Sequence, residues 1–167
     1  SAKNKLVDPE TFASTTSGYY NHNVAQIYKK YQTLLKANNA LDFDDLLIKT
    51  VELFKTHPDV LEMYQEKFRF ILIDEYQDTN YSQYTITRLL ANRYRNICVT
   101  GDPDQSIYGW RGADIRNIMD FEKDYPDAKV VLLEQNYRST KHILHAASSI
   151  IQQNKYRKQK NLWTENM

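Results

Sequence analysis

Apolar residues recur at helical spacing through much of the first third of the chain. Between residues 20 and 35 they fall three or four positions apart, which predicts a helix that ends at Asn38. A second helix is expected to begin with Asp42 as its N-cap and to end before Pro58, because proline breaks a helix in progress. The same proline suits the first turn of a shorter helix that runs to about Lys67. This part of the chain is therefore predicted to be helical.

The stretch that precedes these helices shows no firm period. Residues 1–18 end in Thr15-Thr16-Ser17-Gly18, and their apolar positions follow neither a helical nor a strand spacing. We expect an extended or partly ordered lead-in there.

The period changes in the remainder of the chain. Three short runs of apolar and β-branched residues, Phe68–Ile73, Ile97–Thr100 and Lys129–Leu133, are separated by stretches with helical spacing. Strands that alternate with helices form parallel sheets with crossover helices. The expected fold class is α/β, with a parallel sheet of about three strands flanked by helices and preceded by a helical part.

Helices are expected between and after these strands. The first carries Tyr84 and Leu89, and the second carries the apolar positions of residues 115–119. A last helix, capped by Ser139 or Thr140, leads to a basic tail. Charged tails are usually solvated, and we expect this for the four cations Lys155, Arg157, Lys158 and Lys160.

Composition narrows the class of protein. The chain has 167 residues, 41% of them hydrophobic, with 22 basic and 21 acidic side chains and a formal net charge of +1. A chain of this length can bury a core without disulfides, and its single cysteine, Cys98, has no internal partner. The charge balance excludes a strongly basic nucleic-acid coat but not a local binding site. We expect an intracellular, cytoplasmic protein.

No segment is expected to enter a membrane. The longest clean apolar runs, Phe70–Ile73 and Val130–Leu133, have four residues each, whereas a spanning helix needs roughly 20. No secretory signal is visible either.

Glycine is scarce and concentrated in one loop. Of four glycines, three lie close together at Gly101, Gly109 and Gly112. Because glycine lets the backbone adopt positive φ or approach a ligand closely, this loop is a candidate functional loop.

The first expected strand ends in the acids Asp74 and Glu75. Ligands of parallel sheets bind beyond the carboxyl ends of strands, where one carboxylate can hold Mg²⁺ while the other orients or deprotonates a water. The same pair also suits a solvated helix N-terminus, where the helix dipole favours acidic side chains. Taken alone, the pair favours this second interpretation.

The second expected strand leads into Gln105, Tyr108, Trp110 and Arg111. Gln105 can donate to a phosphate oxygen, and Arg111 can bind a phosphate group. The rings of Tyr108 and Trp110 are two positions apart, which places both on one face of an extended segment where bases can stack. They could also be half-buried strand residues, but the flanking glycines and Pro103 argue against a regular strand.

The third expected strand leads into Tyr137 and Arg138. Arg138 can neutralise charge on a transferring phosphoryl group, and Tyr137 can stack on a base. Three successive strands would then deliver metal-binding, phosphate-binding or stacking groups to one edge of the sheet. That convergence is stronger evidence for a functional edge than any single segment.

Four segments together resemble the motifs of a known family. They are Leu41–Leu46, Ile73–Asn80, Gly101–Asp114 and Gln135–Ser139. In this order they resemble the UvrD/Rep/PcrA family of superfamily-one DNA helicases, over nearly the whole chain. The resemblance implies a partial RecA-like, P-loop NTPase-type fold. It also implies an enzyme that uses ATP and Mg²⁺, moves 3′ to 5′ on single-stranded DNA and acts on 3′-tailed duplex DNA.

The resemblance implies roles for single residues at a nucleotide site. Asp74 resembles the Mg²⁺-holding acid of the family, and Glu75 resembles the acid that activates the attacking water. Gln105 resembles the γ-phosphate sensor. Arg138 resembles a γ-phosphate arginine, and Tyr137 resembles the ring that stacks on the nucleotide base.

A second group resembles the single-stranded DNA contacts of the family. It consists of Tyr108, Trp110 and Arg111. Gly109 departs from the family pattern, in which a bulkier residue more often stands between the two rings, while the pair of rings itself is retained.

One motif of that family is missing from this sequence. None of the glycines begins a G-x-x-x-x-G-K-[ST] phosphate-binding loop. We therefore expect an internal piece of a helicase that is inactive in isolation. Residues 1–40 would end an inserted helical subdomain, residues 41–138 would form the first motor domain without its P-loop strands, and residues 139–167 would begin the second motor domain.

Two other classes of protein stay open. One is a stand-alone single-stranded nucleic-acid binding module that keeps Tyr108 and Trp110 but has no ATPase activity. The other is a metal nuclease that uses the acids Asp74, Glu75, Asp102 and Asp104. His142 and His145 have no third metal ligand nearby in sequence and are expected to be surface side chains.

Overall fold

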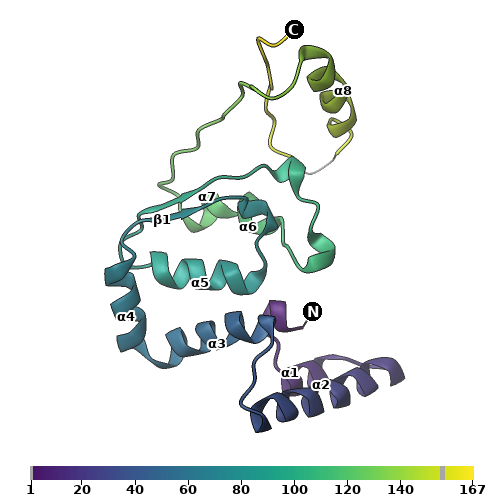
Figure 1. Ribbon diagram of the computed structural model, residues 1–167, viewed down its shortest axis with the longest axis vertical. Coiled ribbons are helices and arrows are strands. Elements are labelled where there is room, and N and C mark those ends of the chain that lie inside the picture. The colour runs from purple at the N-terminus through teal and green to yellow at the C-terminus, as the bar shows by residue number, and fades with distance from the viewer. Residues whose placement is uncertain (1, 155–156) are drawn as a thin grey trace.

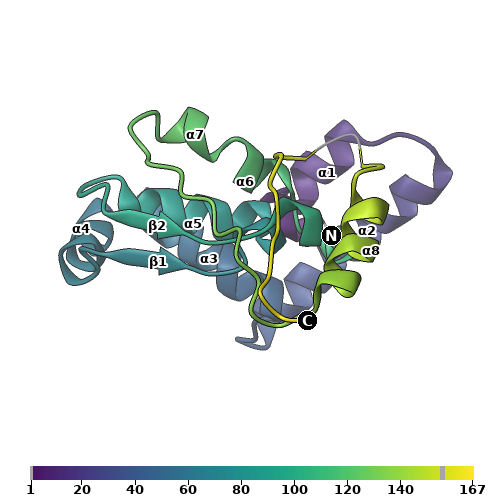
Figure 2. The same ribbon diagram turned by 90° about the horizontal axis from the view of Figure 1, so that it is seen from above.

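A computed structural model describes residues 2–154 and 157–167 and shows mostly helices around a two-stranded parallel sheet (Figures 1 and 2). The α-helices are α1 (Pro9–Thr15), α2 (Tyr19–Ala37), α3 (Phe43–Thr56), α4 (Pro58–Lys67), α5 (Tyr81–Ala91), α6 (Arg116–Met119), α7 (Phe121–Asp124) and α8 (Lys141–Ile151). The strands are β1 (Ile71–Ile73) and β2 (Ile97–Val99), and the 3₁₀ turns are η1 (Lys3–Lys5), η2 (Tyr76–Asp78), η3 (Pro103–Gln105) and η4 (Gly109–Arg111).

In Figure 1 the sheet lies above α5, which in turn lies above α3. Helices α3, α4 and α5 pack against one another next to the sheet, and α1 and α2 form a pair at one end. In Figure 1 this pair lies below α3, and α8 stands at the opposite end of the chain. The loops that follow β1 and β2 lie in the middle part of the molecule, where the candidate residues are concentrated.

The sheet is smaller than the sequence predicts. β1 and β2 are parallel, with Ile71 opposite Ile97 and Ile73 opposite Val99, so the first two strands are confirmed. The third is wrong, because residues 129–133 form no strand and Val130 to Leu133 are 52–82% exposed. A strand needs a neighbour for its backbone groups, and this run has none among the described residues. The observed sheet therefore has two strands instead of about three.

The main helices follow their predicted starts and stops. Asp42 caps α3 as expected: its carboxylate accepts from the Asp45 amide at 2.8 Å, and the Asp45 carboxylate accepts from the Asp42 amide at 3.2 Å. This reciprocal capping box satisfies two amides that a helix N-terminus leaves free. Thr140, rather than Ser139, is the N-cap of α8.

The lead-in is more ordered than its lack of period suggests. It contains η1 and the helix α1, whose N-cap Asp8 accepts from the Thr11 amide at 2.8 Å and whose first residue is Pro9. Capping chemistry, rather than apolar spacing, starts this helix. Phe12 then packs edge-on against Tyr28 of α2, with the ring centroids 6.3 Å apart.

The basic tail is also more ordered than expected. Among its described residues, Arg157 pairs with Asp104 at 3.2 Å, Lys158 pairs with Glu122, and Lys160 pairs with Asp102. The prediction of solvated cations is therefore wrong for Arg157 and Lys160, whose side chains are 16% and 18% exposed, whereas the Lys158 side chain stays 37% exposed. Lys155 lies outside the described residues.

A buried ion pair joins the N-terminal segment to α3. Lys3 is 5% exposed, and its Nζ lies 2.7 Å from Asp42 Oδ2 and 2.8 Å from Asp45 Oδ1. Burial alone would lower the pKa of Lys3, but hydrogen bonds to Asp42 and Asp45 outweigh it and raise that pKa. Burial likewise would raise the pKa of Asp42, but hydrogen bonds from Lys3, the Asp45 amide and Tyr31 lower it. Lys3 and Asp42 therefore stay charged at neutral pH.

None of the helices in residues 2–154 and 157–167 combines the length and the apolar character that a membrane crossing requires.

Replacement of Lys3 by alanine is expected to lower the free energy of unfolding by about 3 kcal/mol, because the buried Asp45 carboxylate loses its cation. Lys49→Ala is the matched control. It breaks a pair with Glu52 in which the side chains are 52% and 56% exposed, and it should cost at most about 0.5 kcal/mol. Urea unfolding followed by circular dichroism measures both values, and equal losses would contradict the buried ion pair.

Candidate functional site

Asp74 follows directly on β1 and lies against the end of β2. Its Oδ1 accepts from the Thr100 hydroxyl at 2.5 Å and from the Glu75 amide at 2.9 Å. These bonds, that from Thr100 above all, lower the pKa of Asp74 below its ordinary value of 3.8. The carboxylate is exposed and ionised at neutral pH, and no hydrogen bond to Oδ2 is found in the described part of the chain. Such an oxygen fits Mg²⁺, a hard cation that binds through one or two carboxylates plus waters and substrate phosphates.

Glu75 has an unusual backbone conformation. Its φ is 51° and its ψ is 44°, in the left-handed region that costs a residue with a Cβ roughly 1–2 kcal/mol. This turn ends β1 abruptly and leads into η2, which leaves the Glu75 side chain exposed at the end of the sheet. Backbone strain of this kind concentrates at functional sites. Glu75 is the N-cap of the short 3₁₀ helix η2, and α5 has its own cap at Asn80, so the two acids do not start an α-helix.

Gln77 is the functional candidate that sequence reasoning missed. Its side chain is 1% exposed; Nε2 donates to Glu75 Oε2 at 2.8 Å, and Oε1 accepts from the Asp102 amide at 3.0 Å. A Cβ added at Gly101 would lie 2.5 Å from that Oε1, so glycine is required where the two loops meet. Gly101 was the signal in the sequence, since it marks a close approach whose partner the sequence does not name.

The loop after β2 begins with a polar turn. Asp102 caps η3 by accepting from the Asp104 amide at 2.9 Å, and its other oxygen accepts from Gln105 Nε2 at 2.8 Å. Burial alone would raise the pKa of Asp102, but hydrogen bonds from Lys160, Gln105 and the Asp104 amide lower it. Asp102 therefore connects the two glutamines. Its carboxylate accepts from the exposed Gln105 side chain, and its backbone amide donates to Gln77.

Tyr108, Trp110 and Arg111 form one cluster. The Arg111 guanidinium lies 5.7 Å from the Tyr108 ring centroid and 5.6 Å from that of Trp110, within cation–π distance of both. The expected extended segment is wrong, because residues Gly109–Arg111 form the turn η4. The two rings instead belong to one cluster because both lie within cation–π distance of the Arg111 guanidinium. Trp110 is 81% exposed and Tyr108 is 39% exposed, so both rings remain accessible.

Tyr137 and Arg138 lie apart from the acids. Tyr137 is 78% exposed and donates through its hydroxyl to Gln135 Oε1 at 2.7 Å. Arg138 is also exposed, and its backbone amide donates to Asn136 Oδ1 at 3.0 Å. The structure shows no contact between either side chain and Asp74 or Glu75 in residues 2–154 and 157–167. These two predicted residues are therefore not brought into the Asp74–Gln105 part of the site.

The four acids considered for a metal nuclease differ in their partners. No group of three or more His, Cys, Asp or Glu side chains that could hold a metal ion occurs among the described residues, His142 and His145 included. Asp102 pairs with Lys160, and Asp104 pairs with both Lys160 and Arg157. Two of the four acids that such an enzyme would use are thus neutralised by cations.

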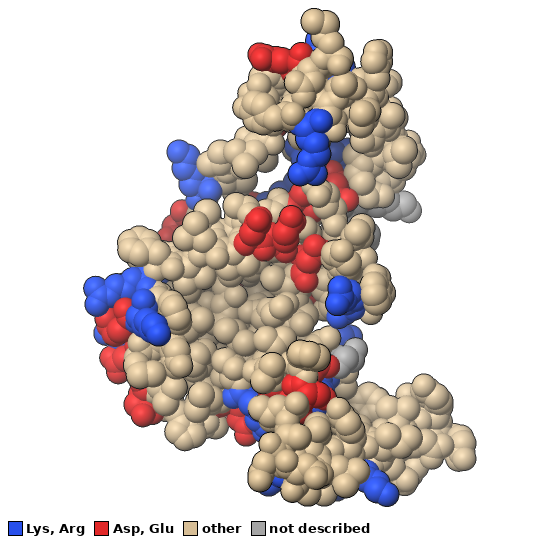
Figure 3. Space-filling model, viewed as in Figure 1, with Lys and Arg blue, Asp and Glu red and all other residues tan. Residues whose placement is uncertain are grey.

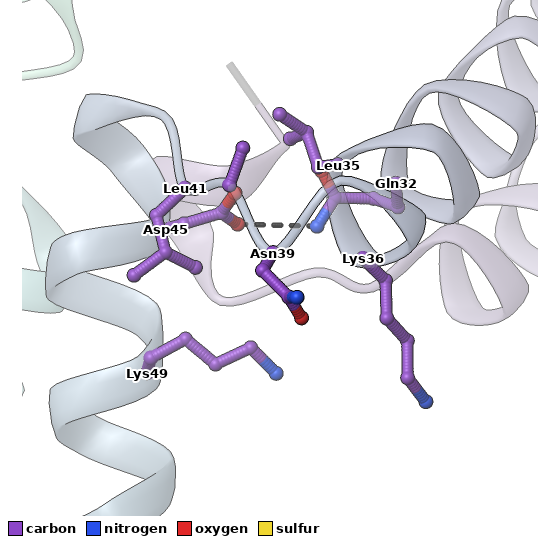
Figure 4. A pocket seen from close by; sticks show the side chains of 8 residues that line it. Gln32, Leu35, Lys36, Asn39, Leu41, Asp45 and Lys49 are labelled. Atoms are coloured by element: carbon purple, nitrogen blue, oxygen red, sulfur yellow. Dashed lines mark hydrogen bonds between the residues drawn. The ribbon is translucent and has the colours of Figure 1, made fainter.

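A cavity of about 490 Å³ lies elsewhere, between α2 and the start of α3 (Figure 4). Gln32 Nε2 reaches across it to Asp45 Oδ1 at 3.1 Å. The residues that line it include Lys36, Asn39 and Lys49, and none of the predicted site residues. It is separate from the Asp74–Gln105 part of the site.

Charge is mixed over the surface. In the view of Figure 3, a group of acidic side chains lies near the middle of the face, and basic side chains lie mainly toward its margins. This agrees with the net charge of +1. That face offers no broad basic surface to a polyanion.

The sequence carries the signature of a helicase family. Residues 1–126 match the profile of the UvrD/REP helicase N-terminal domain, so the chain belongs to the UvrD/REP helicase family. This confirms the resemblance that the four motifs indicate.

The individual relatives are proteins named ATP-dependent DNA helicase PcrA. The chain is 59% identical to that of Bacillus subtilis over 166 residues, which is 99% of this chain. It is 57% identical to that of Staphylococcus epidermidis and 56% identical to that of Staphylococcus aureus, each over 164 residues. In every case the chain spans 22% of the relative's length.

Proposed function

We propose that this chain is a segment of an ATP-dependent DNA helicase that moves 3′ to 5′ on single-stranded DNA and acts on 3′-tailed duplex DNA. The proposal is supported by family membership and by one structural observation above all. Buried Gln77 links the Glu75 carboxylate to the Asp102 amide, at the start of the loop that carries the two rings. An acid suited to phosphoryl transfer is thus hydrogen-bonded through Gln77 to the beginning of the same loop that carries the proposed DNA surface.

In this proposal the acids serve ATP hydrolysis. Mg²⁺ bound with ATP would neutralise charge on the β- and γ-phosphates. Asp74, ionised because of its lowered pKa, offers that cation a carboxylate oxygen. Glu75 orients the attacking water and accepts its proton. The hydrogen bond from Gln77 holds the Glu75 carboxylate in place.

Gln105 belongs to the proposed nucleotide site, and Arg138 and Tyr137, which lie apart from the acids in this structure, would join it when nucleotide binds. Gln105 donates to Asp102 in the present arrangement and, being exposed, can exchange that partner for a γ-phosphate oxygen. Arg138 would neutralise charge on the transferred phosphoryl group, and Tyr137 would stack on the nucleotide base. In the proposed division of the chain, residues 1–40 end an inserted subdomain, residues 41–138 belong to the first motor domain, and residues 139–167 begin the second.

The DNA site in this proposal is the cluster of Tyr108, Trp110 and Arg111. Bases would stack on the exposed rings, and the Arg111 guanidinium would reach a neighbouring phosphate. Stacking accepts any base, which suits an enzyme that moves along DNA.

A second candidate is a stand-alone single-stranded nucleic-acid binding module without ATPase activity. The observation in its favour is the exposed pair of rings beside Arg111, which suits base stacking and needs no nucleotide chemistry.

Trp110→Ala is expected to weaken binding of mixed-sequence single-stranded DNA by about 1–3 kcal/mol, because a base loses its stacking surface. Fluorescence anisotropy of a labelled oligonucleotide measures the affinity. Trp163→Ala is the matched control, since Trp163 is 48% exposed and contacts the chain through its backbone. The stacking cluster would be refuted by equal losses in the two variants or by a preference for one base sequence.

The chain as printed is expected to hydrolyse no ATP, because the amides and lysine of a P-loop supply much of the positioning and charge stabilisation in phosphoryl transfer. DNA-stimulated turnover should appear in a longer chain that adds an upstream P-loop and a whole second motor domain. Glu75→Gln should abolish it there. A steady-state ATPase assay with Mg²⁺ and single-stranded DNA makes the comparison.

Turnover by the printed chain that Glu75→Gln removes would mean that a nucleotide site exists without a P-loop, and the proposal of a helicase segment would fail. Absence of turnover from the longer chain, with DNA binding retained, would favour the binding module.

A further inference from the structure

Two acids of the Leu41–Leu46 motif have no part in the proposed chemistry. Asp42 and Asp45 lie at the start of α3, and their carboxylates hold the Lys3 ammonium at 2.7 Å and 2.8 Å. The side chain of Asp45 is 2% exposed and that of Lys3 is 6% exposed. Through Lys3, the motif therefore fixes the position of η1. Asn4 follows Lys3 in the same turn.

Asn4 lies directly against the turn that carries the rings. Its side chain is buried, and Nδ2 donates to the backbone oxygen of Arg111 at 3.3 Å. A Cβ added at Gly112, where φ is 98°, would lie 2.8 Å from the same nitrogen. The end of η4 thus rests on the amide of Asn4, and the close approach explains why glycine stands at residue 112.

The start of α5 holds η1 from the other side. Ser82, which is fully buried, donates through its hydroxyl to the Asn4 backbone oxygen at 3.2 Å. Asn80, the N-cap of α5, donates to Asn4 Oδ1 at 3.5 Å. Figure 1 shows the N-terminal end beside the ends of α3 and α5. Asn4 is therefore fixed before DNA arrives.

We propose that Lys3 and Asn4, called here the η1 bracket, position the stacking cluster for single-stranded DNA, and that Asp42 and Asp45 hold the bracket in place. The inference rests on the proposed DNA-binding function of the cluster. The four are positioning residues in this proposal, since they act on DNA only through the turn that carries the rings, which Asn4 contacts at the Arg111 backbone oxygen.

A substitution that removes a negative charge distinguishes the proposed positioning role from a general electrostatic effect on DNA binding. Asp45→Asn removes one negative charge, which by itself should tighten binding of a polyanion. It also removes the ion pair with Lys3 and puts an NH₂ group in place of one carboxylate oxygen, so that it faces either the Lys3 ammonium or the Asp42 amide, which loosens the bracket. The bracket therefore predicts weaker binding where charge alone predicts the opposite.

The experiment compares Asp45→Asn with Asp59→Asn, which removes the same charge from the exposed first turn of α4. Anisotropy of a labelled mixed-sequence oligonucleotide gives the affinity. A second series in a Trp163→Phe background records how far saturating DNA quenches Trp110 emission. All variants are measured where urea titration shows them folded. Asn4→Ala is measured in parallel, so the test does not depend on one variant.

Asp45→Asn and Asn4→Ala are expected to weaken binding about three- to tenfold and to reduce the quenching amplitude, while Asp59→Asn changes neither. Unchanged or tighter binding by both variants, with wild-type quenching, would overturn the bracket. If Trp110→Ala also leaves the affinity unchanged, the proposed DNA site itself has failed. If Trp110→Ala weakens binding and the bracket variants do not, only the bracket has failed.

Discussion

The buried side-chain amide of Gln77 is the constraint on which the candidate site depends. β1 and β2 have three residues each, and a pair that short does little to fix the loops that leave it. Gln77 supplies what the sheet lacks, because its amide donates to Glu75 and accepts from Asp102. Leaving such a group buried without partners costs about 1–3 kcal/mol, so the two loops are held together through it. The close approach at Gly101, where an added Cβ would lie 2.5 Å from Gln77 Oε1, belongs to the same contact.

Polar contacts of this kind hold much of the tertiary structure, while several apolar side chains stay exposed. Leu72 on β1 is 79% exposed and Leu133 is 82% exposed, whereas Lys3, Asp45 and Gln77 are buried. Buried polar groups fix geometry more narrowly than apolar packing does, because each demands a partner at one distance and direction. The chain therefore positions its stacking cluster and its acids with hydrogen bonds and ion pairs.

Features that depend on neighbouring residues in the sequence were predictable. The cap at Asp42, the break at Pro58 and the first two strands each follow from local chemistry, and the structure confirms them. Features that depend on contacts between residues far apart in the sequence could not be predicted. Residues 129–133 have the composition of a strand, but pairing requires a neighbour that the run itself cannot specify.

The same distinction applies to the site. The motifs placed Asp74 and Trp110 in the right loops, and their chemical roles stay predictions. Gln77 and Lys3 gave no signal, because a polar residue in a polar stretch does not reveal that it is buried. Gly101 was the indirect signal for Gln77, since the tight approach requires glycine. Lys160 pairs with Asp102 across 58 positions of sequence, which no local pattern encodes.

Amide hydrogen exchange at Asp102 tests the central claim most directly. The account predicts that this amide is protected by Gln77 and exchanges about tenfold faster in Gln77→Met, a variant of similar shape without the acceptor. The Thr100 amide, which donates to the Ile73 oxygen at 2.8 Å, should keep its protection and so shows that the sheet is intact. An Asp102 amide that exchanges at the wild-type rate in Gln77→Met would contradict the link between the two loops.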